Sequence, residues 1–216
     1  MGVNHELKLY HYWRSSCSWR VRWALEYKEV PFQTEVINLL KAEQKSEDYK
    51  RKAPTGHVPC MSIDSKYQLT ESLAIIDWLE EVYPEKSLYP SSAMEKAQVK
   101  ELANIIASGT QPIQNLKVLK FYSEDAEMKK KWASHFIREG LRAYESKLKA
   151  LGFSGKFSYK DQITVADLCL VPQVYNANRF EVDMTEFPLI NKINENSLLE
   201  VSCKRAHPDT YAPNNS

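Results

Sequence analysis

The 216-residue sequence carries no excess of charge of either sign, since 29 Lys and Arg stand against 28 Asp and Glu. Its basic runs, 50–52 and 129–131, are short, and solvated surface is their expected role. A protein that binds nucleic acid through its phosphates needs an extended basic patch. The composition therefore argues against a nucleic-acid partner.

Cysteine is scarce, and the copies are widely separated, at Cys17, Cys60, Cys169 and Cys203. The sequence has no CxxC pair and no His/Cys spacing of a zinc site. We therefore expect neither a disulfide framework nor a metal site, and the pattern suits a reducing compartment.

Long apolar runs are missing as well, so no membrane span is expected. The first residues lack the apolar core of a signal peptide, and Glu6 stands where a myristoylation signal has Ser or Thr. There are no internal repeats. These absences predict a cytoplasmic protein.

The first third alternates short strands with helices. Period-two patterns predict strands at 7–13 and 32–37, and a hairpin joins 58–64 to 67–70. Cys17, Val21, Ala24 and Leu25 form one apolar stripe of the first helix, 41–52 is a surface helix or loop, and 71–83 is helical. This order matches a thioredoxin-like sheet with helices on both faces.

The chain after the Pro- and Ser-containing linker at 84–92 is predicted to be helical. Gly109 and Pro112 bend a first segment, and a second places Trp132, Phe136, Leu141, Tyr144 and Leu148 on one face. Residues 165–175 form a buried helix, with Thr164 as N-cap, Asp167 closing a capping box, and Ile163 and Leu168 able to form a hydrophobic staple. The predicted fold class is α+β, with a thioredoxin-like domain at 1–84 and an all-α domain at 92–216.

Two short motifs of the first domain suit a peptide ligand. Pro59 enters the third strand, where a cis Val58–Pro59 bond leaves the preceding backbone open to an extended peptide. At 70–72 a strand turns into a helix, whose first N–H groups bind anions. There Ser72 adds a hydroxyl donor and Glu71 a partner for an amine, although both residues also suit plain helix capping.

The stretch Ser-Ser-Cys at 15–17 stands at another strand-to-helix turn. A partly buried helix start stabilises an anion by up to ~2 kcal/mol, and a hydroxyl donated to a charged group adds roughly 1.5–3 kcal/mol. Lowering a thiol pKa by two units requires roughly 2.7 kcal/mol, so a thiolate is feasible here. Cys17 itself or a bound thiol held by Ser15 is the candidate. The apolar stripe and the missing partner cysteine favour the bound thiol.

Blocks at 15–25, 71–81, 106–119, 164–180 and 207–210 carry a resemblance that runs nearly end to end. Through them the chain resembles the zeta-class glutathione transferases, a family that includes maleylacetoacetate isomerases. The block Ser-Ser-Cys-x-Trp-Arg-Val-Arg is the most specific. Trp23 departs from the family's small aliphatic residue, and Ala53, His57, Cys60 and the loop 158–162 depart as well.

The resemblance implies a glutathione transferase fold and a role for each matching residue. Ser15 activates the sulfur of glutathione, with Ser16 and Cys17 beside it. The implied glutathione contacts are Val58, Glu71, Ser72 and Gln111. His57 is a further implied contact, and the alternative for it is a surface loop histidine. Arg179 matches a position that binds a carboxylate of a small acidic substrate, and a pair with an acidic neighbour is the alternative.

The implied activity is glutathione-dependent isomerisation of maleylacetoacetate to fumarylacetoacetate in tyrosine and phenylalanine breakdown. Action on α-haloacids is a further expectation, and the family forms homodimers. Two alternatives stay open: a glutathione-dependent thiol oxidoreductase working through Cys17, and a glutathione-binding module without catalysis.

Overall fold

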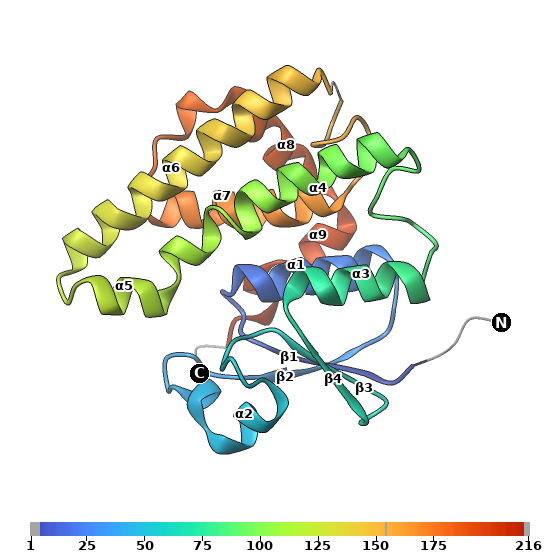
Figure 1. Cartoon of the computed structure of the whole chain (residues 1–216), viewed down its shortest axis with the longest axis vertical. Helices are drawn as coiled ribbons and strands as arrows, with labels where there is room; N and C mark the ends of the chain where they lie inside the picture. Colours follow the sequence, from blue (N-terminus) through green and yellow to red (C-terminus); the bar gives the residue numbers. More distant parts are fainter. Residues whose placement is uncertain (1–4, 154, 214–216) are drawn as a thin grey trace. The chain divides into compact units, whose positions relative to one another are not determined.

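A four-stranded mixed sheet organises the first part of the chain (Figure 1). The computed structural model describes residues 5–153 and 155–213. The strands lie in the order β2-β1-β3-β4, with β1 parallel to β2 and the other neighbours antiparallel. Their bounds are β1 Leu7–His11, β2 Gln33–Val36, β3 Cys60–Ile63 and β4 Tyr67–Thr70. Because parallel neighbours need a crossover, helix α1, Ser16–Tyr27, connects β1 to β2.

Helices cover both faces of this sheet, as the sequence predicts. Helices α1 and α3, Ser72–Val82, lie on one face, and the short α2, Glu47–Lys52, lies on the other (Figure 1). Of the predicted α1 stripe, Val21, Ala24 and Leu25 are buried and Cys17 is half-buried. On α3, Ile75, Ile76 and Leu79 are buried and Val82 is half-buried. Under α2, a second cluster packs Tyr49 against residues of β1 and β3. The thioredoxin-like prediction is confirmed.

By its packing the chain divides into two units, Leu88–Leu199 and the remainder. The sequence-based domain limits stay a prediction, but the segment from Glu200 onward packs with the first unit. Helix α9, Val201–Ala206, contacts α1, and the indole Nε1 of Trp23 donates to Ser202 Oγ at 3.1 Å. Large aromatic side chains on α1 thus make the surface that receives this segment.

A buried arginine of α1 ties together the end of β1 and the C-terminal segment. The guanidinium of Arg22, fully buried, donates at 3.1–3.5 Å to the carbonyl oxygens of Tyr12, Trp13 and Ala206 and to His11 Nδ1. Because a guanidinium can only donate, Nδ1 of His11 accepts and the ring proton lies on Nε2. Burial lowers the pKa of Arg22 to about 10, and burial together with the charge of Arg22 lowers the pKa of His11 to about 3.

This pair predicts a loss of stability in mild acid. The unfolded chain takes up the His11 proton as the pH falls through about 6.5, whereas the folded chain does so only near a pH of about 3. As the pH falls from about 6.5 to about 3, the contribution of His11 should therefore lower the free energy of unfolding, by at most about 1.4 kcal/mol per pH unit. Above this range of pH the contribution is constant. Urea unfolding near pH 7 and near pH 5.5 measures the slope.

The matched control is His11→Asn, which keeps an acceptor near the position of Nδ1 but does not titrate. Wild type should lose about 1 kcal/mol more than this variant between the two pH values. Contributions of the carboxylates cancel in the comparison. Identical pH dependence in the two proteins would contradict the assignment of a neutral, buried His11.

The second unit is helical. The predicted bend follows α4, where a 3₁₀ turn at Gln111–Gln114 contains Pro112. Every residue from Val165 to Val174 is buried, which confirms the predicted central helix. The helices are α4 Ala93–Ala107, α5 Leu116–Tyr122, α6 Ala126–Leu151, α7 Val165–Arg179 and α8 Pro188–Leu199. Helix α7 packs against α4, α6 and α8.

The predicted apolar face of α6 is partly wrong. Leu141, Tyr144 and Leu148 are buried as expected, but the N-terminal half of the helix buries Ala133 and Ile137 rather than Trp132 and Phe136. The 3.6-residue period continues from 141 to 137 and 133, so the two aromatic residues fall beside the stripe. They are half-buried and contact each other with tilted rings, 4.8 Å between ring centroids.

A buried carboxylate fixes the start of α7. Asp167 accepts hydrogen bonds from the amide of Thr164 at 2.8 Å, from its hydroxyl at 3.0 Å and from the amide of Ser158 at 2.7 Å. The predicted cap is confirmed. Desolvation raises the pKa of Asp167, opposed by these hydrogen bonds. The same contacts fasten the preceding loop to the helix start.

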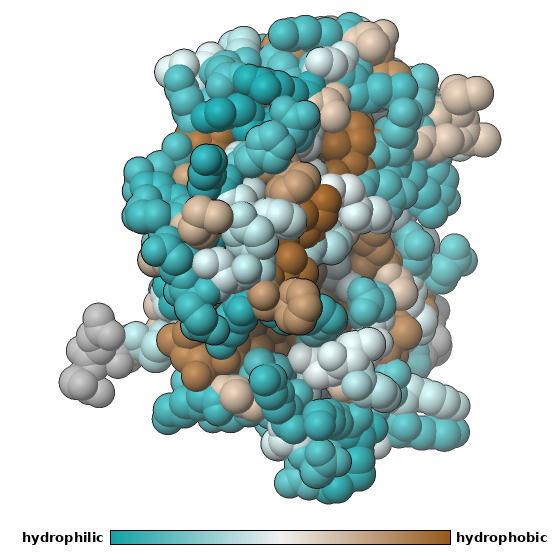
Figure 2. All heavy atoms as spheres, turned by 60° about the vertical axis from the view of Figure 1, so that its left-hand side comes forward, coloured by the Kyte–Doolittle hydropathy of each residue, from teal (hydrophilic) through white to brown (hydrophobic). Residues whose placement is uncertain are grey.

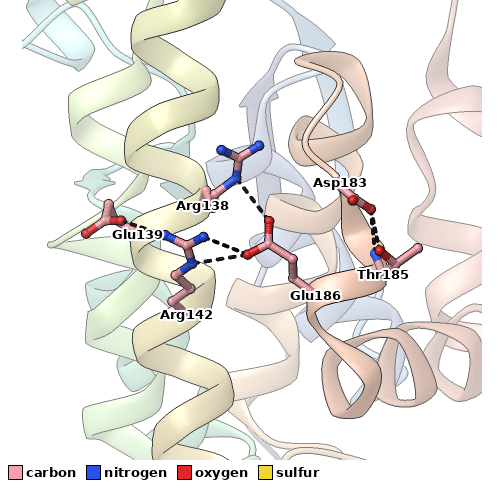
Figure 3. A network of polar contacts seen from close by, with 6 residues as sticks. All are labelled: Arg138, Glu139, Arg142, Asp183, Thr185 and Glu186. Carbon is pink, nitrogen blue, oxygen red and sulfur yellow. Dashed lines mark hydrogen bonds and ion pairs between the residues drawn. The ribbon is translucent and has the colours of Figure 1, made fainter.

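Ion pairs hold the chain that follows α7 (Figure 3). Glu186, in a 3₁₀ turn at Met184–Glu186, lies 2.8 Å from Arg142 and 3.4 Å from Arg138, both on α6. Asp183 caps the turn by accepting from Thr185. The end of α7 is thereby tethered to α6 a few residues after Arg179.

The face shown in Figure 2 is mainly hydrophilic, with hydrophobic residues emerging in separate patches. Among residues 5–153 and 155–213, no helix is both long enough and apolar enough for a bilayer span.

Candidate active site

The β1-to-α1 turn presents a hydroxyl at the start of a helix. Ser15 is the N-cap of α1, and its Oγ accepts from the amide of Ser18 at 3.2 Å. Its own amide donates to the carbonyl of Tyr12 at 3.0 Å, which closes the turn. A hydroxyl has one proton to donate besides its acceptor lone pairs. Ser15 therefore caps the helix and keeps its O–H for another partner.

The first turn of α1 is electropositive. Ser16 is buried and Cys17 half-buried, in agreement with the expected partial burial of this thiol. The first N–H groups of a helix have no partner within the helix, and this turn contains no acidic residue that would offset the positive end of the dipole. An anion placed beside Ser15 would meet a favourable field.

The register of the sheet brings the other predicted motifs to the same end. Tyr10, near the end of β1, pairs with Cys60 at the start of β3, and Cys60 pairs with Thr70 at the end of β4. The segments that precede β3 and follow β4 therefore lie at the edge where β1 turns into α1. Val58 belongs to the first of these segments, and Ser72 belongs to the second.

The predicted cis bond is present between Val58 and Pro59. His57, just before it, is half-buried, and its carbonyl accepts from the hydroxyl of Tyr49 at 2.7 Å. Helix α2 thus holds this loop through its main chain.

Backbone strain marks the third motif. Glu71, the exposed N-cap of α3, has φ 66° and ψ 113°, a conformation that costs of order 1–3 kcal/mol for a residue other than glycine. Ser72, the first residue of α3, is only 5% exposed, and its Oγ accepts from Nη1 of Arg20 at 3.3 Å. Strain of this kind clusters at binding sites, which favours a binding role over plain capping.

Two predicted residues belong to the second unit. Gln111 begins the 3₁₀ turn after α4 and is half-buried. Arg179 is the last residue of α7 and is exposed, and its Nη1 donates to Asn176 Oδ1 at 3.2 Å. The structure thus gathers Ser15, Ser16, Cys17, Val58, Glu71 and Ser72 at one end of the sheet, with His57 beside Val58, while Gln111 and Arg179 are placed within their own unit.

The four thiols differ in accessibility. Cys60, Cys169 and Cys203 are buried, and burial raises the pKa of Cys60 to about 11 and that of Cys203 to about 12. Only Cys17 is partly exposed. Since the reactive species is the thiolate, buried thiols of this kind are inert.

We predict one fast-reacting thiol per chain. A chromogenic aromatic disulfide should modify Cys17 in the native protein and the other three cysteines only after unfolding, because their thiols are buried. Stopped-flow absorbance gives the number of thiols in each phase. Cys17→Ala should abolish the fast phase, and a fast phase that persists in this variant would contradict the burial pattern.

Known proteins share both the sheet and its site region. Residues 14–82 match the model of the glutathione S-transferase N-terminal domain. A probable maleylacetoacetate isomerase 2 of Drosophila melanogaster is 46% identical over 203 residues, which cover 93% of this chain and 87% of that protein.

Two solved structures resemble the whole fold. A bacterial maleylpyruvate isomerase, described as a zeta-class glutathione S-transferase, has a TM-score of 0.92 at 35% identity, covering 97% of this chain and 100% of its own. The maleylacetoacetate isomerase of Anaeromyxobacter dehalogenans with glutathione in its active site has a TM-score of 0.88 at 36% identity, covering 99% of both chains. The fold is that of a glutathione transferase. The chain belongs to the zeta class of these transferases, the family of the maleylacetoacetate isomerases.

Proposed function

We propose that this chain is a glutathione-dependent enzyme that isomerises maleylacetoacetate to fumarylacetoacetate in tyrosine and phenylalanine breakdown. The observation that carries the proposal is Ser15, which caps α1 through its acceptor and keeps a proton to donate at the positive end of the helix. That arrangement suits the thiolate of bound glutathione.

The chemistry needs a nucleophile that both adds and leaves. A double bond conjugated to carbonyl groups resists rotation. When a thiolate adds, a sulfur–carbon bond forms and the electron pair moves onto the carbonyl as an enolate. The remaining single bond rotates, the enolate collapses, and the sulfur leaves with its electron pair. The product is the trans alkene, and glutathione is regenerated without oxidation or reduction.

Each residue of the first unit has a proposed role in holding glutathione. Ser15 donates to the sulfur, with Ser16 and Cys17 beside it. The main chain of Val58 pairs with the cysteinyl unit, and His57 adds a contact next to it. Glu71 binds the amine and Ser72 the carboxylate of the γ-glutamyl group.

The second unit supplies the remaining proposed contacts. Gln111 reaches glutathione, and Arg179 binds a carboxylate of the small acidic substrate. Arg179 is suited to this role because it is exposed at the end of a buried helix whose following turn is tethered to α6. Cationic groups near the carbonyls also stabilise the enolate. Small α-haloacids suit the same chemistry, and a cytoplasmic location agrees with the free cysteines.

The alternative through Cys17 rests on its partial exposure. In that case the Cys17 thiolate would attack a disulfide substrate, forming a mixed disulfide and releasing one thiol. Glutathione would then free Cys17 by thiol–disulfide exchange and end as a disulfide, so that free glutathione is consumed. The other alternative is a glutathione-binding module without catalysis. The Ser15 hydroxyl proton, which is available for a bound sulfur, argues against this alternative.

We predict that Ser15→Ala lowers isomerase turnover by a factor of about 10²–10³, since one donor to a developing or bound anion is removed. Cys17→Ala should retain substantial activity. Maleylacetone, a stable stand-in for the substrate, serves for the assay, and free thiol is followed at the same time. The thiol concentration should stay constant through many turnovers.

Two outcomes would contradict this mechanism. Loss of thiol that matches product formation would replace isomerisation by conjugation. Abolished turnover in Cys17→Ala, with Ser15→Ala near wild type, would move the reacting sulfur to the protein.

A homodimer is proposed as the working form. Helix α4 carries an exposed face of mixed character that includes Met94, which is 69% exposed. An isologous contact would bury both copies of such a patch. Light scattering at micromolar concentration should give twice the 25.0 kDa of one chain, and a mass of one chain would contradict the dimer.

A further inference from the structure

The block of sequence that is most specific to the family contains two arginines, and neither has a role in the proposed glutathione site. Arg20 and Arg22 lie on α1 two residues apart and therefore face different directions. Arg22 holds the end of β1 and the segment from Glu200. Arg20 is turned toward the start of α3 instead, and it is 2% exposed.

A single nitrogen of Arg20 joins two residues of the candidate site. Its Nη1 lies 3.3 Å from Oγ of Ser72 and 3.7 Å from Sγ of Cys17. Ser72 begins α3, and Cys17 lies in the first turn of α1. The guanidinium thus fixes two helix starts in relation to one another within the first unit.

The contact also sets the direction of the Ser72 hydroxyl. A guanidinium has only donors, so Oγ of Ser72 must accept from Arg20. The hydroxyl proton then points away from Arg20 and is available to a third group, which has to be an acceptor. A serine held in this way favours a carboxylate and disfavours a ligand that offers only donors.

We propose that Arg20 is a positioning residue that makes Ser72 a dedicated donor and thereby selects for the α-carboxylate of the γ-glutamyl group. This inference rests on the proposed binding of glutathione. Arg20 itself need not touch the ligand.

The test compares two ligands on each variant. The first is glutathione, and the second is γ-aminobutyryl-cysteinyl-glycine, which lacks only the α-carboxylate. Calorimetry gives both dissociation constants, and their ratio measures selection for the carboxylate. Wild type should prefer glutathione by about 10–100-fold, the range of a hydrogen bond to a charged group.

Arg20→Met should raise the dissociation constant of glutathione by about tenfold or more and that of the analogue by less than about twofold. The ratio of the two constants then falls toward one. Arg20→Lys, which keeps a charge and only donors, should restore much of it. On a Ser72→Ala background, Arg20→Met should cause little further loss of selectivity, because the two residues act as one unit. Arg51→Met, at a 72% exposed side chain, is the matched surface control.

Arg20→Gln, shorter and uncharged, takes the place of the Met variant if that variant does not fold. Equal weakening of both ligands by Arg20 variants would assign Arg20 a merely structural role and overturn the inference. Selective binding without isomerisation of maleylacetone would overturn the proposed function and leave the inference standing. Failure of wild type to bind glutathione would overturn both.

Discussion

The site depends on one buried cation that holds the turn between β1 and α1. The guanidinium of Arg22 donates to the carbonyls of Tyr12 and Trp13, and the carbonyl of Tyr12 also closes the turn by accepting from the amide of Ser15. The position of Ser15 therefore rests on a charge that is itself 0% exposed. The same guanidinium binds the carbonyl of Ala206, so the C-terminal segment completes the support of this turn. Loss of Arg22 would remove this donor from the carbonyls of Trp13 and Ala206, at about 1–3 kcal/mol each, while the carbonyl of Tyr12 would keep only its contact with Ser15.

Around this turn the sheet register concentrates three weak features into one site. A helix start, a loop before β3 and a strained residue before α3 are each common in proteins. The pairing of Tyr10 with Cys60 and of Cys60 with Thr70 brings them to one end of the sheet. Binding of an anionic peptide that carries a thiol would account for both the strain at Glu71 and the hydroxyl of Ser15 at the start of α1.

Much of this could be predicted from the sequence because the signals are local. The alternating strands and the Thr164 and Asp167 cap depend on neighbours within a few residues. The cis Val58–Pro59 bond follows instead from the place of this dipeptide in the order of strands and helices. The contacts of Arg20 and Arg22 could not be predicted, because Ser72 and Ala206 are 52 and 184 residues away. The apolar pattern predicts Trp132 on the buried face of α6, whereas the structure buries Ala133 there. The prediction is wrong because a large aromatic residue dominates the pattern over a small alanine beside it. Which surface receives the segment from Glu200 likewise depends on long-range packing that a short apolar pattern does not encode.

The central claim is that the positive start of α1 and the hydroxyl of Ser15 hold glutathione as its thiolate. The most direct measurement is the pKa of the glutathione thiol in the complex, followed by the ultraviolet absorbance of the thiolate in a pH titration. The account predicts a value about two units below the ~8.5 of a free thiol in wild type, and a return toward the free value in Ser15→Ala. A bound thiol that titrates like free glutathione in the wild-type protein would contradict it.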